Sequence, residues 1–197
     1  MEPSSVNAPA ARRSPSTSQR TEREREQERN ERALEAKRDQ YARLNAAARA
    51  YRAAARDAVY AAERGEDTDA QTLDAAKEAW ADQYAQAQMM LPKKVLNIVS
   101  DLNRSLGLGY SVVKQLPNSP DRNAACERGK AWFNGPLSDG VYLLRVTLRH
   151  DLGVEAEEPF EQTSRQILDA LLQSDRLLAD QLASERGRGA AATHSGD

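Results

Sequence analysis

Residues 34–62 have the sequence LEAKRDQYARLNAAARAYRAAARDAVYAA, and this stretch decides the fold. Apolar or small side chains recur in it every seven residues, and a second set lies three positions further on: Leu34, Tyr41, Ala48, Ala55 and Ala62, then Leu44, Tyr51 and Ala58. A seven-residue repeat is typical of an α-helix that packs against other helices. Alanine is also the strongest helix former. We therefore predict a long amphipathic helix that ends at Arg64-Gly65, because glycine suits the left-handed position after a helix.

On the N-terminal side of this seam, charged residues replace the apolar ones. From Glu22 to Arg32 every side chain is charged or carries an amide, and opposite charges lie at helical spacing. Thr21-Glu22-Arg23-Glu24 has the form of a capping box, which is typical of a helix start. We expect a solvated helical extension over residues 21–33. Residues 1–20 hold three prolines and five serines, and we expect them to form a disordered arm.

Three further helices are predicted between the seam and Gly153. The second helix begins at the capping box of residues 68–71 and reaches Leu91. At Pro92 we prefer a break, with the proline in the first turn of the third helix, over a kinked continuous helix, since an interior proline costs ~3 kcal/mol. The third helix runs to about Leu116.

The fourth helix starts after a Ser119 cap with Pro120 at its first position, and it ends at Asp151-Leu152-Gly153. Asn134-Gly135-Pro136 should break or bend it near the middle. The predicted core faces of these helices place four large side chains together, so we expect them to be mutually buried: Trp80, Leu102, Trp132 and Leu144.

An acidic linker leads to a fifth helix, which Pro159 opens. Its apolar stripe consists of Phe160, Ile167, Leu168, Leu171, Leu172, Leu178 and Leu182. The sequence predicts an all-α fold: an antiparallel up-down bundle over residues 21–153, an appended amphipathic helix over residues 154–186, and a disordered tail over residues 187–197. Because the bundle already has four elements, we expect the stripe to make an intermolecular or end-on contact. Docking within the same chain, against the basic third helix, is the alternative.

Composition excludes several classes of site. The chain has 28 Lys and Arg against 30 Asp and Glu, but only two histidines and one cysteine. His150, His194 and Cys126 cannot build a Cys/His zinc site, and no combination of nucleophile, base and orienting group is visible. We predict no catalytic, metal or cofactor site. His150 lies at a helix end, where histidine suits the negative terminus.

Cys126 has Arg122 and Lys130 four residues away on either side, a setting that can lower the pKa of a thiol. We favour the simpler interpretation, a small, partly buried side chain. No apolar run approaches the ~20 residues of a membrane span. The N-terminus has no apolar segment typical of a secretory signal, so we expect a cytoplasmic location.

Two hypotheses for function remain. Residues 100–116 have the apolar and glycine spacing of a degenerate helix-turn-helix, with Asn103 where a small residue lets the helices touch. Residues 92–133 carry seven basic and three acidic side chains (+4), whereas residues 151–186 carry three basic and nine acidic ones (−6). A basic middle could bind DNA, but we favour its pairing with the acidic C-terminal helix inside the fold.

The order of features from Glu31 to Gly153 resembles that of uncharacterised α-helical bundle proteins of high-GC actinobacteria. The similarity consists of an Arg/Ala-rich first helix, a Trp/Tyr helix that ends at Leu91-Pro92, and the closing stretch of residues 144–153, LRVTLRHDLG. Proteins of this kind have no assigned activity, so the resemblance implies no residue role. Our first hypothesis is a non-enzymatic interaction or scaffold protein that binds a protein partner or itself through the C-terminal helix. A DNA-binding regulator is the alternative.

Overall fold

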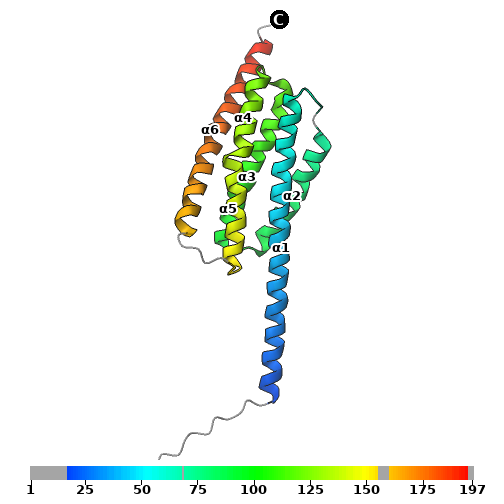
Figure 1. The fold of residues 1–197 in the computed structure, drawn as a ribbon, viewed down its shortest axis with the longest axis vertical. Coiled ribbons are helices and arrows are strands. Elements are labelled where there is room, and N and C mark those ends of the chain that lie inside the picture. Colours follow the sequence, from blue (N-terminus) through cyan, green and yellow to red (C-terminus); the bar gives the residue numbers. More distant parts are fainter. Residues whose placement is uncertain (1–16, 68, 155–159, 195–197) are drawn as a thin grey trace, which may run out of the picture. The chain divides into compact units, whose positions relative to one another are not determined.

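The computed structural model describes residues 17–67, 69–154 and 160–194. These residues form helices, and no strand occurs among them (Figure 1). The elements are α1 (Thr17–Glu63), α2 (Ala70–Met90), α3 (Lys93–Gln115), the short 3-10 helix η1 (Leu116–Asn118), α4 (Arg122–Asn134), α5 (Pro136–Asp151) and α6 (Phe160–His194). The all-α prediction is confirmed, and the up-down order of the helices stays a prediction.

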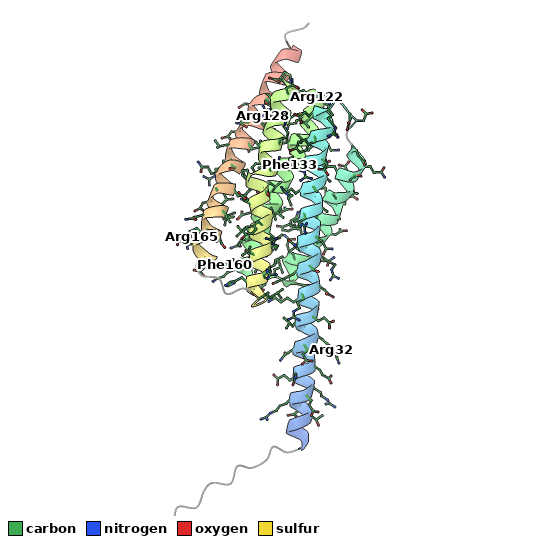
Figure 2. All side chains as sticks on the ribbon, viewed as in Figure 1. Arg32, Arg122, Arg128, Phe133, Phe160 and Arg165 are labelled. Atoms are coloured by element: carbon green, nitrogen blue, oxygen red, sulfur yellow. The ribbon has the colours of Figure 1, made fainter. Side chains whose placement is uncertain are left out.

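The chain divides into two units, residues 1–38 and 39–197, and α1 contributes to both. In the first unit, the side chains of residues 21–38 are exposed except for the half-buried Lys37. Figure 2 shows Arg32 pointing away from the helix; its guanidinium lies 3.1 Å from the carboxylate of Glu28. Leu34 is 39% exposed, so its predicted place in the core is wrong. The predicted start at Thr21 is also wrong, because α1 begins at Thr17. The rest of the predicted N-terminal arm lies outside the described residues.

Within the second unit, α3 is the central helix. It contacts α2, α4, α5 and α6, while α5 and α6 lie side by side (Figure 1). The core is one cluster of buried side chains that contains every seam position of α1 from Tyr41 to Ala62. The four large side chains predicted to be buried together all belong to this cluster: Trp80, Leu102, Trp132 and Leu144. The seam prediction is therefore confirmed for the second unit.

Two hydrogen bonds join α1 to α4 and α5, and a glycine of α4 lets α1 approach closely. Nε of Arg52 donates a hydrogen bond to the carbonyl oxygen of Phe133 at 2.8 Å. The hydroxyl of Tyr41 donates to Oδ2 of Asp151 at 2.5 Å. A Cβ atom added at Gly129 would lie 3.0 Å from a methyl of Val59, so a larger residue would have to displace this side chain of α1.

Two helices end at the glycines that the sequence indicated. Gly65 and Gly153 have φ angles of 72° and 70°, the left-handed conformation that costs glycine little. After α1, Glu66 N–H bonds to Ala61 C=O and Gly65 N–H to Ala62 C=O. The same pair of bonds follows α5. Both predicted stops are confirmed as Schellman caps.

The helix starts differ from the predictions in detail. Asp69 caps α2, since its carboxylate accepts from the Thr72 N–H at 3.0 Å; Thr68 lies outside the described residues. Asp121, not Ser119, caps α4 by accepting from the Ala124 N–H at 2.9 Å, so the predicted Ser-Pro start is wrong. At the N-cap position of each helix, the aspartate carboxylate accepts a hydrogen bond from a free backbone amide of the first turn.

Pro92 and Pro136 each lie where one helix ends and the next begins. Pro92 precedes α3 as its N-terminal cap residue, one position before the first-turn place that we predicted. Pro136 is the first residue of α5, so the predicted fourth helix is two helices, α4 and α5. The missing N–H of proline is harmless at these positions, because the first amides of a helix have no intrahelical acceptor.

The C-terminal helix packs on its own chain and is longer than predicted. Leu171, Leu178 and Leu182 of α6 are buried in the core, so the helix is not merely appended to the bundle. The other four residues of the stripe are half-buried, and self-association through this helix stays a prediction. The helix extends to His194, well into residues that we expected to be a disordered tail. Pro159, the predicted first residue, lies outside the described residues.

Candidate functional site

One face of α3 carries polar side chains that bind α2. Nε1 of Trp80 donates to Oδ1 of Asn103 at 2.8 Å, and the hydroxyl of Tyr84 donates to Oγ of Ser100 at 3.2 Å. Further along, the hydroxyl of Tyr110 donates to Oδ1 of Asp74 at 2.8 Å. Ser100, Asn103 and Tyr110 recur at intervals of three and seven, which is the spacing of one helix face.

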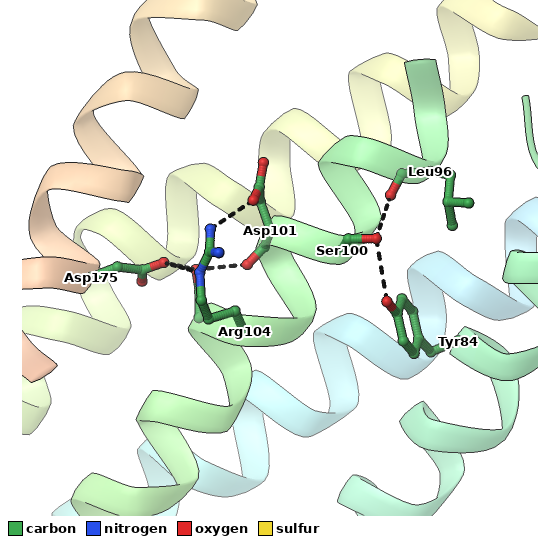
Figure 3. Close-up of polar contacts among 7 residues, drawn as sticks. Tyr84, Leu96, Ser100, Asp101, Arg104 and Asp175 are labelled. Atoms are coloured by element: carbon green, nitrogen blue, oxygen red, sulfur yellow. Dashed lines mark hydrogen bonds and ion pairs between the residues drawn. The ribbon is translucent and has the colours of Figure 1, made fainter. Parts of the chain in front are cut away.

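A second set of polar side chains on α3 binds α6. Figure 3 shows Arg104 between two carboxylates, Asp101 on its own helix and Asp175 on α6. Its Nη2 atom lies 2.6 Å from Asp101, and its Nε atom lies 3.5 Å from Oδ2 of Asp175. Oγ of Ser105 lies 3.0 Å from the same Oδ2 atom and 3.1 Å from the carbonyl oxygen of Asp101, so these two acceptors share its single proton. We call Asp101, Arg104, Ser105 and Asp175 the α3–α6 network.

Asp175 is the unusual member of the α3–α6 network. It is 4% exposed, and among the residues that the structure describes it is the only carboxylate that is buried. Its second oxygen, Oδ1, is buried with no hydrogen-bond partner. Burial raises the pKa of Asp175 above its ordinary value, while the Ser105 hydroxyl and the Arg104 guanidinium act in the opposite direction. Sequence reasoning missed this residue.

A signal for Asp175 was nevertheless present in the sequence. Leu171, Leu178 and Leu182 are buried, and a helix places the residue four positions after Leu171 on that same face. An aspartate in a leucine stripe is therefore directed into a core. The prediction took the leucines of the stripe and omitted the polar residue between them.

The helix-turn-helix prediction for residues 100–116 is wrong as a structure. No turn interrupts α3 between Lys93 and Gln115. Gly107 is exposed inside the helix, and Gly109 is buried where an added Cβ would lie 2.8 Å from Cε1 of Phe133. Asn103, which we took as a small contact residue between two helices, binds the indole of Trp80. Gly109 allows close packing of α3 against α4, and neither glycine marks a change of direction.

Much of the basic charge of residues 92–133 is paired within the chain. Arg128 of α4 forms an ion pair with Glu185 of α6, and Arg104 reaches Asp175. These two contacts confirm that the basic middle meets the acidic C-terminal helix inside the fold. Lys93 and Lys94 are exposed.

The residues considered for chemistry do not assemble a reactive centre. Cys126 is buried, and burial raises the pKa of its thiol despite the opposing charges of Arg122 and Lys130. His150 lies in the last turn of α5, as expected, and stacks on Phe160 with ring centroids 4.2 Å apart. Within residues 17–67, 69–154 and 160–194, no group of three His, Cys, Asp or Glu side chains could hold a metal ion.

A shallow groove of about 210 Å³ lies between the α4–α5 corner and α6. Trp132 and Leu178 line it together with Leu177, which is 59% exposed. Ligand pockets for small molecules have volumes of roughly 300–1,000 Å³, so this groove is too small for such a ligand.

Comparison with family models, curated proteins and solved structures found no match to this chain. The resemblance to actinobacterial helical proteins therefore stays a prediction. Across the part of the chain that the structure describes, no helix combines the length and apolarity needed to cross a membrane.

Proposed function

We propose that this protein is a non-enzymatic helical interaction or scaffold protein of the cytoplasm. The observation that carries the proposal is the first unit: residues 21–38 of α1 are helical, yet their side chains are exposed apart from the half-buried Lys37. A helix that is polar all round its axis contributes little to a core. Such a helix suits the recognition of a partner by charge.

Its charges are arranged in rows. Glu24, Glu28, Glu31 and Glu35 are separated by four, three and four residues, so they lie on one face of the helix. We call them the glutamate row. Arg25, Arg29 and Arg32 form a neighbouring row with the same spacing. A partner helix could pair a row of Lys or Arg with the glutamate row and a row of Glu with the arginine row. Charged side chains form such pairs beside the seams of coiled coils.

The DNA-binding alternative has less support. Its recognition helix depended on a turn that α3 does not make. Four basic side chains of this region also lie within 4 Å of a carboxylate of the same chain: Arg104, Lys114, Arg128 and Lys130. Phosphate binding needs basic side chains that can release counterions. We retain this alternative as one outcome of the experiment.

The proposal is tested by affinity purification of the tagged full-length protein from its own cells, with quantitative mass spectrometry. The variant Glu28→Gln with Glu31→Gln removes the centre of the glutamate row, including the carboxylate of Glu28 that lies 3.1 Å from the Arg32 guanidinium within the same helix. Each glutamate is expected to form one exposed ion pair of ~0.5 kcal/mol with the partner. Losing both pairs should weaken the binding of that partner about fivefold. The control, Glu78→Gln with Asp82→Asn, removes the same charge from the exposed surface of α2.

A partner whose recovery falls with the glutamate-row variant and not with the control supports the proposal. Equal recovery of every co-purified protein by both variants contradicts it. Salt-dependent retention of the wild type on DNA, abolished by Lys93→Glu with Lys94→Glu, would favour the regulator instead.

A further inference from the structure

We infer that protonation of Asp175 controls how firmly α6 is docked on α3 and α5. The inference rests on the α3–α6 network and is independent of the proposed function. It assigns to α6 a conformational response to pH.

The position of Asp175 in the interface is fixed by its neighbours on α6. One turn before it, Leu171 packs where α5 has a glycine: a Cβ added at Gly140 would lie 2.9 Å from Cδ2 of Leu171 and 3.3 Å from Cδ1 of Leu102 on α3. One turn after it, Leu178 is buried. Asp175 therefore enters the core whenever α6 docks in this register, and it cannot turn to solvent while these contacts persist.

The ionised carboxylate is only partly compensated there. Oδ2 shares the single proton of the Ser105 hydroxyl with the carbonyl oxygen of Asp101, whereas Oδ1 has no partner. The Arg104 guanidinium approaches Oδ2 through Nε at 3.5 Å, but its Nη2 atom is committed to Asp101 at 2.6 Å. The charged groups that face Asp175 are Arg104, which attracts it, and Asp101, which repels it. Both belong to α3; the nearby α5 position is Gly140, which faces Leu171 one turn before Asp175 and carries no charge.

The sign of the pH effect follows from this geometry. A buried carboxyl that lacks full compensation favours its neutral form, and the pKa of Asp175 in the docked helix is raised. In an undocked helix the side chain is hydrated and returns to its ordinary pKa. Docking is therefore strongest when Asp175 is protonated, below both pKa values. It weakens as the pH rises from the undocked pKa through the docked one, and stays weakened at neutral pH.

The experiment is hydrogen exchange of the full-length protein followed by NMR or mass spectrometry, between pH 3 and 7.5. Rates for the amides of residues 166–184 are corrected for intrinsic exchange and give the opening equilibrium of α6. In the wild type, opening should increase with pH, by about tenfold for each pK unit that separates the docked and undocked pKa values. In Asp175→Asn the opening should be low at every pH, because the isosteric amide carries no charge.

The control is Asp180→Asn, which removes an exposed carboxylate from the same helix and should leave the wild-type profile unchanged. Ser105→Ala removes the hydrogen bond that favours the ionised form, so its profile should move to higher pH. A carbon-13 titration of the Asp175 carboxyl provides a readout that does not depend on opening. A wild-type profile identical to that of Asp175→Asn, or a carboxyl that titrates at its ordinary pKa, would overturn the inference.

Discussion

The indole nitrogen of Trp80 lies 2.8 Å from Oδ1 of Asn103 and donates a hydrogen bond to it. Trp80 is buried, and its partner is half-buried on α3. A buried N–H group that loses its acceptor costs ~1–3 kcal/mol. The bond therefore penalises any register of α2 against α3 that separates the two side chains.

The Trp80–Asn103 bond can be measured with a double-mutant cycle. Asn103→Ala leaves the indole N–H unpaired and should destabilise the protein by ~1–3 kcal/mol, whereas Trp80→Phe removes the donor itself. The double variant should be more stable than the sum of the single losses by ~1 kcal/mol, because neither unpaired group is then left. Urea denaturation gives the three free energies of unfolding. Strictly additive losses would show that the bond contributes nothing.

The two glycines of α3 should respond in opposite directions to alanine. Gly107 has nothing within 4 Å of an added Cβ, so Gly107→Ala should stabilise the helix by ~0.5–1 kcal/mol. At Gly109 the added Cβ would lie 2.8 Å from the Phe133 ring, and overpacking of this kind costs ~1–3 kcal/mol. Thermal unfolding followed by circular dichroism measures both. Destabilisation by Gly107→Ala would indicate a turn at this position after all.

Trp132→Ala tests the core between α4 and α3. Its side chain is buried in the main cluster, so truncation should cost ~3–5 kcal/mol, a large part of the stability of a typical domain. The control is Tyr142→Ala, since Tyr142 is 48% exposed on α5 and its loss should have a much smaller effect. If the Trp132 variant melts within a few degrees of the wild type, the side chain contributes little to the core.

Asp74 should make the protein sensitive to acid. Hydrogen bonds from Tyr110 and Lys114 lower the pKa of its carboxyl below the ordinary value of 3.8. A group with a lowered pKa stabilises the fold above its unfolded pKa, and this stabilisation is lost as the pH falls through its folded pKa. Between pH 6 and pH 3, Asp74→Asn should therefore lose less stability than the wild type in urea denaturation. Asp82→Asn, at an exposed site on the same helix, serves as the control and should follow the wild type.

Along α1, periodicity predicted which side chains are buried from Tyr41 onward. Tyr41, Ala48 and Ala55 keep the seven-residue seam and are all in the core, because that spacing returns to one face of the helix. Leu34 has the same spacing and is exposed. The repeat specifies a face of the helix, but it does not specify how far along the helix other elements extend.

The parts that sequence reasoning missed depend on long-range packing. The leucine stripe of α6 had to be covered, yet the stripe alone could not say whether its own chain or another would cover it. Gly107 and Gly109 suggested a turn by local preference, but α3 continues through both, since tertiary context often overrides helix propensity. Asp175 could be predicted as a buried carboxylate only by knowing that its face of α6 is covered. That information comes from the docked position of α6.

The polar contacts between α2 and α3 also bear on the order in which the chain folds. Tyr84 and Ser100 close a loop of 16 residues, whereas Tyr41 and Asp151 are 110 residues apart. Because the entropy of loop closure grows with the logarithm of length, the longer closure costs about 1.7 kcal/mol more. Short-range contacts of this kind form rapidly. We therefore expect the α2–α3 hairpin to be structured in the folding transition state before α1 docks on α5.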